Sequence, residues 1–344
     1  LLVLGLTKPE DYRSLPANGN PGSYTFDWRG AVNGAPILLV IPALLLWRPR
    51  RYASDRRSLR RFASCVLIVL AVALVANAWP LSRPAFSSYD DQLGYRPYQA
   101  FIDDVKGKGG LVFWSLSEAR DFHEFDAGPL GAVTVKTEPH AEALLMTTGY
   151  TGFGGLYQDG RTSIKPGELW DRLLQLPASE QRPIPVLIGE LAFHGLSDEG
   201  KDLHRLVMGV QVKVRTVAGV LEALRSGHSY AVGEGDHHVQ LRLGEFRGVC
   251  EGGTKSASIG DRLDPGVARD LTILLSVTAR DDGRHPVKVR VIRSGEVLAQ
   301  FSGETPFRLN WPDTTAPTAE PLTYRVEITG SGELLSNPIF VGKG

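Results

Sequence analysis

The sequence predicts an α/β protein that is held in a membrane by an N-terminal helical hairpin and ends in a β-sandwich. Three observations support this fold class. Two nearly uncharged apolar runs, 31–47 and 62–79, flank an arginine-rich loop. Between residues 95 and 234, helical spacing, glycine turns and short apolar runs alternate as they do in αβ units. After about residue 235, apolar residues recur at every second position, which is typical of half-buried strands.

Length and composition define the class of protein before any motif is considered. The chain has 344 residues, more than one compact core usually holds, so several structural units are expected. Its formal net charge is zero, so no overall positive field attracts nucleic acid, and a nucleic-acid partner is not expected. Cys65 lies in an apolar run and Cys250 in a region of strand character, which argues against a disulfide between them and against a zinc-type cysteine cluster.

Residues 1–30 form a separate N-terminal segment. The chain opens with an apolar stretch that has neither an initiator Met nor a basic region ahead of it, so we expect a truncated segment rather than an intact signal peptide. The apolar residues 1–5 are themselves a candidate strand.

The two apolar runs predict a transmembrane hairpin over residues 31–80. Each run has about 17 or 18 residues, at the short end of the length that crosses the hydrocarbon core. Trp47 and Trp79 end the runs, where interfacial aromatic residues are expected. Because arginines crowd the loop, the positive-inside rule places it in the cytoplasm. The membrane is therefore an expected partner, with everything after Pro80 extracytoplasmic. A buried helical hairpin of a soluble protein is the alternative.

Residues 95–234 are expected to form an α/β domain. A helix, a glycine turn and a short apolar run make one αβ step, and the pattern recurs along this region. The segment 150–157, rich in glycine and aromatic residues, is expected to be a loop packed against the rim of the domain. The expected helices are 98–105, 170–174 and 217–226, and the expected strands are 111–114, 132–135 and 186–189.

Residues 235–344 are expected to form a β-sandwich. Alternating patterns such as 239–243 and 287–291 are separated by turn residues at intervals of about ten residues, which favours a small sandwich. A domain boundary is expected near residues 233–236.

Four short motifs occur in a fixed order in the region 98–341. They are Gly109-Gly110-Leu111-Val112-Phe113-Trp114-Ser115, Gly189-Glu190-Leu191-Ala192-Phe193-His194-Gly195, the segment 221–230 and the segment 335–341. Together they resemble the PHP superfamily, the polymerase-and-histidinol-phosphatase group of metal-dependent phosphoesterases and related hydrolases, in its branch with a β-rich C-terminal appendage. The resemblance implies a distorted (β/α)₇ barrel, here partial or degenerate, with two or three divalent metal ions held by His, Asp and Glu at the strand ends.

The resemblance also implies a cofactor and a substrate class. A divalent ion, Zn, Mn or Mg, would lower the pKa of bound water and neutralise charge on the oxygens of a small-molecule or phosphoester substrate. The chain departs from the family pattern, because the opening His-x-His and the Asp-His pair after it are not found at the corresponding positions. Leu116 stands where the family has a His, and Ala192 where the last motif carries an Asp. We therefore expect the full metal cluster to be absent.

His194 and Glu190 are the strongest candidate metal ligands. His194 matches a ligand position of the family directly, and Glu190 lies four residues before it, so one strand end can bring an imidazole and a carboxylate to the same ion. The alternative is that both are ordinary polar groups at the barrel mouth.

Four further residues are weaker candidate ligands. Glu118 and His123 follow the strand 111–114, and either can replace, from further along the loop, the imidazole that Leu116 does not supply. The alternative is that both are solvated loop residues, because loops are polar by default. Glu138 and His140 follow the expected strand 132–135, and polar residues at strand ends of a barrel favour a site.

Two functions stay open at this point. The first is a membrane-anchored, extracytoplasmic, metal-dependent hydrolase of the phosphoesterase class with a reduced metal cluster. The second is a non-catalytic PHP-derived binding or scaffolding module at the membrane, which Leu116 and Ala192 favour.

Overall fold

The structure resolves into two compact units, Thr7–Asp104 and a larger unit of Leu1–Leu6 with Val105–Gly344. We call them the helical unit and the α/β unit. The computed structural model describes residues 1–16, 31–32, 34–48, 57–77, 86, 92–126, 128, 131–157, 161–176, 184–192, 203–235, 239–250, 253–264, 271–315 and 321–342.

The helical unit contains one helix that is long and apolar enough to cross a membrane. This is α4 (Arg57–Asn77), in which Ser58–Asn77 meets the length and composition of a span. The first apolar run gives a shorter stretch, η1 (Ala35–Leu39) followed by α3 (Val40–Trp47). Pro36 lies in the first turn of η1, the place where a helix tolerates a missing N–H. Among the described residues, only one of the two expected spans is a helix long enough to cross a membrane, and the transmembrane hairpin stays a prediction.

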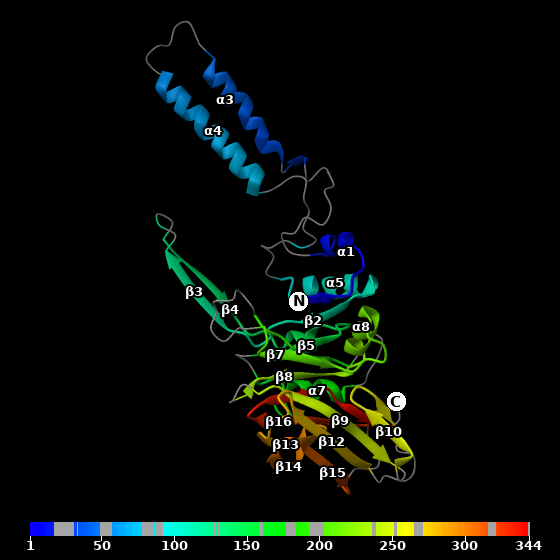
Figure 1. Cartoon of the computed structure of the whole chain (residues 1–344). Coiled ribbons are helices and arrows are strands. Elements are labelled where there is room, and N and C mark those ends of the chain that lie inside the picture. The colour runs from blue at the N-terminus through cyan, green and yellow to red at the C-terminus, as the bar shows by residue number, and fades with distance from the viewer. Residues whose placement is uncertain are drawn as a thin grey trace. The chain divides into compact units, whose positions relative to one another are not determined.

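Small residues bring α3 and α4 together (Figure 1). The Ser64 hydroxyl donates a hydrogen bond to the Ala43 carbonyl oxygen over 2.8 Å, and Ala43 and Ala71 are buried. Large apolar side chains on the same helices, Phe62 and Val69 among them, are two-thirds exposed. Small side chains therefore line the contact between α3 and α4, and large apolar side chains lie on the outer surface of the pair.

The α/β unit begins with a four-stranded sheet in the order β1-β2-β5-β6. The strands β2, β5 and β6 are parallel, whereas β1 pairs antiparallel with β2. The strands expected at 1–5, 111–114 and 186–189 are confirmed. Their bounds are β1 (Leu2–Leu4), β2 (Leu111–Trp114), β5 (Gly152–Leu156) and β6 (Val186–Gly189).

The segment that includes β5 was expected to be a loop, and this expectation is wrong. The glycines of β5 permit a close approach to β6: a Cβ on Gly152 would lie 2.0 Å from the Val186 carbonyl oxygen, and one on Gly155 would lie 2.6 Å from Leu187 Cδ1. A strand with larger side chains would not fit here.

Most of α5 (Arg96–Gly107) belongs to the helical unit, whereas the other helices below and a hairpin belong to the α/β unit. The three expected helices are confirmed, and β4 confirms the strand expected at 132–135. The β3–β4 hairpin projects from the body of the unit (Figure 1). The bounds are α5 (Arg96–Gly107), α6 (Ala143–Met146), α7 (Leu169–Gln175), α8 (Val217–Arg225), β3 (Asp121–Asp126) and β4 (Ala132–Thr137).

The rest of the α/β unit is built from two β-sheets around one apolar core. One sheet has the order β10-β9-β12-β15, and the other has the order β11-β18-β16-β17-β8-β7. In the second sheet, β13 also pairs with β16, and β14 pairs with β13. Alternate residues of β12 are buried in the shared core, as the alternating pattern predicts. The bounds are β7 (Leu206–Val210), β8 (Ser229–Gly233), β9 (Leu241–Cys250), β10 (Lys255–Ser258), β11 (Arg262–Leu263), β12 (Leu271–Ala279), β13 (Pro286–Arg293), β14 (Glu296–Glu304), β15 (Phe307–Asp313), β16 (Leu322–Gly330), β17 (Glu333–Ser336) and β18 (Ile339–Val341).

The strand β8 joins the two halves of this unit, because it pairs with β17 on one side and β7 on the other. The sheet thus continues across the boundary expected near residues 233–236. The described strands do not close into a barrel: β1, β2, β5 and β6 form an open sheet, and β8 belongs to another.

The strands β6 and β8 nevertheless lie side by side and run in the same direction. A Cβ on Gly227, just before β8, would lie 3.6 Å from Val186, the first residue of β6. A Cβ on Gly189, the last residue of β6, would lie 3.3 Å from Ala231 Cβ. The carboxyl ends of β2, β5, β6 and β8 therefore gather at one edge, and we call the residues that follow them there the strand-end site.

Candidate functional site

Glu190 lies at the centre of the strand-end site, directly after β6. Its Oε2 accepts a hydrogen bond from the Ser115 hydroxyl over 2.8 Å, and its Oε1 accepts one from the Leu116 backbone N–H. Leu116 has a left-handed backbone, with φ 51°, which few non-glycine residues adopt. The family resemblance expects a His side chain at position 116. The chain has Leu116 there, and the backbone N–H of this residue donates to Glu190.

Burial raises the pKa of the Glu190 carboxyl above its ordinary value. The hydrogen bonds from Leu116 and Ser115 act in the opposite direction, as does the charge of nearby His140, but they do not cancel the effect of burial on this pKa. A carboxyl that holds its proton more tightly than usual at the ends of parallel strands is a candidate functional group.

The two other predicted residues near β2 contact the loops around it. Glu118 Oε1 accepts hydrogen bonds from the backbone N–H groups of Thr162 and Ser163, over 3.1 and 3.0 Å. The His140 ring packs on Trp114, with ring centroids 5.6 Å apart. The structure therefore brings His140 within electrostatic range of Glu190, whereas Glu118 fastens a neighbouring loop.

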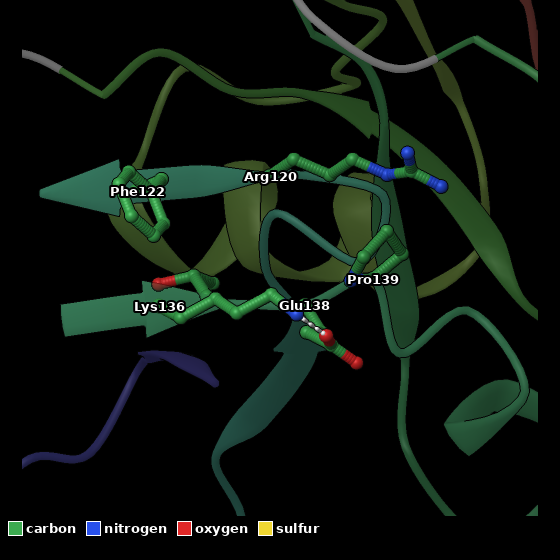
Figure 2. A pocket seen from close by; sticks show the side chains of 6 residues that line it. Arg120, Phe122, Lys136, Glu138 and Pro139 are labelled. Atoms are coloured by element: carbon green, nitrogen blue, oxygen red, sulfur yellow. Dashed lines mark ion pairs between the residues drawn. The ribbon is translucent and has the colours of Figure 1, made fainter. Parts of the chain in front are cut away.

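His123 and Glu138 belong to the β3–β4 hairpin. His123 pairs with Val135 across the hairpin. Glu138 follows β4, forms an ion pair with Lys136, and is exposed to solvent. Figure 2 shows this pair with Phe122 and Arg120 around an open pocket of about 400 Å³. The hydrogen bond and charge of Lys136 lower the pKa of the Glu138 carboxyl. These two candidates lie on the hairpin rather than with Glu190.

His194 lies outside the described residues, so the predicted pair of Glu190 and His194 stays a prediction. Within the part of the chain that the structure describes, no three His, Cys, Asp or Glu side chains lie close enough together to hold a metal ion. The metal cluster that the resemblance implies stays a prediction, because a metal ion needs several convergent ligands and His194, which follows β6, lies outside the described residues.

A cavity of about 280 Å³ at the strand ends was not anticipated from the sequence. Arg161 Nη1 lies 2.6 Å from Glu333 Oε1, and Arg205 Nε lies 3.7 Å from Glu234 Oε2. Glu234 directly follows β8, just as Glu190 directly follows β6, and this position after a strand is the sequence signal that could have indicated the cavity. The cavity is lined by Leu156, Tyr157, Arg161, Leu191, Arg205, Leu206, Gly233, Glu234, Gly235 and Glu333.

Comparisons with known proteins add no relative: no family model, no curated protein and no solved structure matches this chain. The function therefore has to be argued from the strand-end site itself.

Proposed function

We propose that the chain is a membrane-anchored, extracytoplasmic binding module derived from a PHP-type (β/α) barrel, and that it holds a small anionic solute at the strand ends without metal chemistry. One observation carries the proposal. Both described carboxylates that follow strands β2 and β6, Glu118 and Glu190, accept hydrogen bonds from neighbouring loops. They serve to organise the site rather than to converge on an ion.

Two arginines in the strand-end cavity supply the affinity for an anion. A guanidinium offers a rigid fork of donors that matches carboxylate and phosphate groups. Arg161 is half exposed and is held by Glu333, which is nearly buried, so the fork is oriented before a ligand arrives. An incoming anion would take the exposed side of this fork, while Leu156 and Leu206 cover the apolar part of the solute.

The helical unit supplies the anchor in this proposal. The helix α4 crosses the membrane, α3 packs against it as the second arm of the hairpin, and the arginine-rich loop 48–61 faces the cytoplasm. The α/β unit is then extracytoplasmic.

Thiol labelling in intact cells tests this topology. Lys288→Cys on β13 should react with a membrane-impermeant maleimide, and Ser54→Cys in the loop should react only after lysis. Background labelling is low because Cys250 is buried and Cys65 lies in α4. The reverse pattern of labelling would place the α/β unit in the cytoplasm.

The binding function is tested with the full chain purified in detergent without chelators. We expect no stoichiometric Zn, Mn or Mg by elemental analysis, and we expect phenyl phosphate to bind with an affinity that falls about tenfold in Arg161→Met, since loss of one charge-assisted contact costs about 1.4 kcal/mol. Arg308→Met on β15 is the matched control. Equal affinity in the Arg161→Met variant and the wild type would contradict the proposal.

A metal-dependent hydrolase is the second candidate, because the raised pKa of Glu190 is of the kind that catalytic carboxyls show. This function predicts bound metal and Mn²⁺- or Zn²⁺-stimulated phosphodiester hydrolysis. Both would be lost in His194→Ala and strongly reduced in Glu190→Gln. Those losses would decide for the hydrolase and against the non-catalytic module.

A further inference from the structure

A second cavity, of about 500 Å³, lies at the other end of β8. It is bounded by α8, by the segment 211–214 after β7, and by the turn 258–261 between β10 and β11. His228 precedes the first residue of β8, whereas the strand-end site follows the last. The two cavities are therefore separate sites, and the inference below does not depend on the proposed function.

A connected polar network forms one side of this cavity. His228 Nε2 lies 2.8 Å from Asp261 Oδ1, and Asp261 Oδ2 accepts a hydrogen bond from the Ser258 N–H over 3.3 Å. The Ser258 hydroxyl donates to Gln211 Oε1 over 3.2 Å. Side chains from three separate segments thus converge on this cavity. Several convergent polar groups are typical of ligand-binding pockets, whereas an isolated ion pair on the surface is not.

The backbone fixes this network in place. The His228 N–H donates to the Ala223 carbonyl oxygen over 2.8 Å, and the Gln211 N–H donates to the His228 carbonyl oxygen over the same distance. Gly260 has φ 82°, and a Cβ there would lie 2.5 Å from the Ser226 carbonyl oxygen. Because only glycine fits, the turn that carries Asp261 is held against the end of α8.

The charges around the cavity favour an anionic ligand. Asp261 is paired with His228, and Glu222 accepts hydrogen bonds from Arg225 and the Ser226 hydroxyl. Lys213 is exposed on the rim and pairs with none of the described residues. The carboxylates are thus matched by protein donors, and Lys213 is the charge that a ligand would neutralise.

The remaining lining defines the shape of the ligand. Val212, Val214 and Ala223 form an apolar wall, and Gln211 has side-chain N–H donors in addition to the oxygen that Ser258 contacts. The volume lies within the range of small-molecule sites, roughly 300–1,000 Å³. A compact molecule with one acidic end and a short apolar end matches both features.

We propose that this cavity is a binding site for a small organic carboxylate. Its acid group sits on Lys213 with Gln211 and His228 beside it, and its short apolar chain packs on Val212, Val214 and Ala223. No covalent chemistry is involved.

The site is tested by histidine footprinting of the full chain in detergent, with butanoate as the probe. Diethyl pyrocarbonate modifies accessible imidazoles, and mass spectrometry reads each histidine separately. We expect butanoate to slow the modification of His228 and to leave that of His285 unchanged. His285 is an internal control, because its Nε2 also lies 2.8 Å from an aspartate, Asp281, in an unrelated turn.

Two lysine variants then connect this protection to the cavity. In Lys213→Met, half-protection of His228 should require about tenfold more butanoate. Lys288→Met, an exposed lysine on β13, should behave as the wild type. Gln211→Ala is the second variant if Lys213→Met does not fold. Absence of protection, equal protection by butylammonium, or unchanged protection in the variant of Lys213 that folds would each overturn the proposal.

Discussion

The α/β unit holds the carboxyl groups of Asp171 and Glu190 in different ways. Between α7 and β16, the carboxylate of Asp171 meets the guanidinium of Arg325 in two hydrogen bonds, of 2.8 and 2.6 Å, and both side chains are almost completely buried. At the strand-end site, Glu190 is held by a hydroxyl and a backbone N–H, both neutral. A full charge thus neutralises Asp171 where two layers must stay joined, whereas neutral donors hold Glu190 at the strand ends.

The contact between α7 and β16 is reinforced by packing. The Arg325 guanidinium lies over the Trp170 ring, 4.8 Å from its centre, and Trp170 packs edge-on against Phe153 of β5. Figure 1 shows α7 lying between the parallel strands and the β-rich layers. The pair therefore connects the first sheet of the unit to the second through one helix.

Breaking this buried pair should give the largest effect. Asp171→Ala leaves the Arg325 guanidinium buried without its counter-charge, so we expect the free energy of unfolding to fall by about 3–5 kcal/mol. Chemical unfolding of the full chain in detergent measures it. Glu245→Ala, which removes an ion pair with Arg247 that is more than one-third exposed, should cost less than about 1 kcal/mol. Similar losses in the two variants would mean that burial adds nothing to the contribution of the Asp171–Arg325 pair.

A neutral buried contact should come next in size. Asn337 is fully buried, and its side-chain amide bonds both the N–H and the carbonyl oxygen of Leu187 on β6 and the carbonyl oxygen of Ser229 on β8. Asn337→Ala leaves these backbone groups without partners, and we expect a loss of about 3 kcal/mol. The exposed Asn310 on β15 is the matched control, and its alanine variant should stay within about 0.5 kcal/mol of the wild type. A loss below 1 kcal/mol for Asn337→Ala would contradict this account of how β6 and β8 are joined.

At the strand-end site, an added methyl group should displace Glu190. A Cβ on Gly154 would lie 2.0 Å from Glu190 Oε1, so Gly154→Ala forces the carboxylate away from Leu116 and Ser115. We expect a loss of about 2 kcal/mol, as for other overpacked positions. Gly107→Ala at the end of α5 meets nothing within 4 Å and should leave stability almost unchanged. Equal stability of these two variants would show that Glu190 moves freely.

The sequence predicted those elements whose identity depends on local pattern. The alternation along β13 and the apolar runs of β2 and β6 are properties of a few consecutive residues, and these strands form where they were expected. The strand β5 was missed because two of its glycines pack against β6, a partner about 30 residues away, and the third packs against Glu190 just after it. Close approach of two strands leaves no pattern within either one.

At the strand-end site, the sequence predicted Glu190, Glu118 and His140 as candidate metal ligands but did not predict their partners. Glu190 and His140 do lie near each other, as polar residues after strands should. The donors to Glu190 and Glu118 are largely backbone N–H groups, which every residue type but proline possesses. Residue types with metal-ligand chemistry do not mark the positions of such backbone donors. The leucine side chain at position 116 gives no sign that its N–H binds Glu190.

The smallest expected effect concerns the pH dependence of stability. Burial raises the pKa of Glu190 in the folded protein, so the native state keeps this proton at pH values where the unfolded chain has released it. The stability contributed by this carboxyl is full below its ordinary pKa and is lost as the pH rises through the raised value. Glu190→Gln does not titrate, so its Tm relative to the wild type should increase steadily from pH 4.5 to pH 7.

Glu138→Gln provides the opposite slope. Lys136 lowers the pKa of the Glu138 carboxyl, so its contribution is present above the ordinary pKa and is lost as the pH falls. The Tm of Glu138→Gln relative to the wild type should therefore decrease, slightly, as the pH rises toward 4.5 and then level off up to pH 7, because this pair is exposed and screened. A flat pH profile for Glu190→Gln would mean that water reaches the carboxyl in the native state. The strand-end site would then differ from the Asp171–Arg325 contact in hydration rather than in the kind of donor that holds its charge.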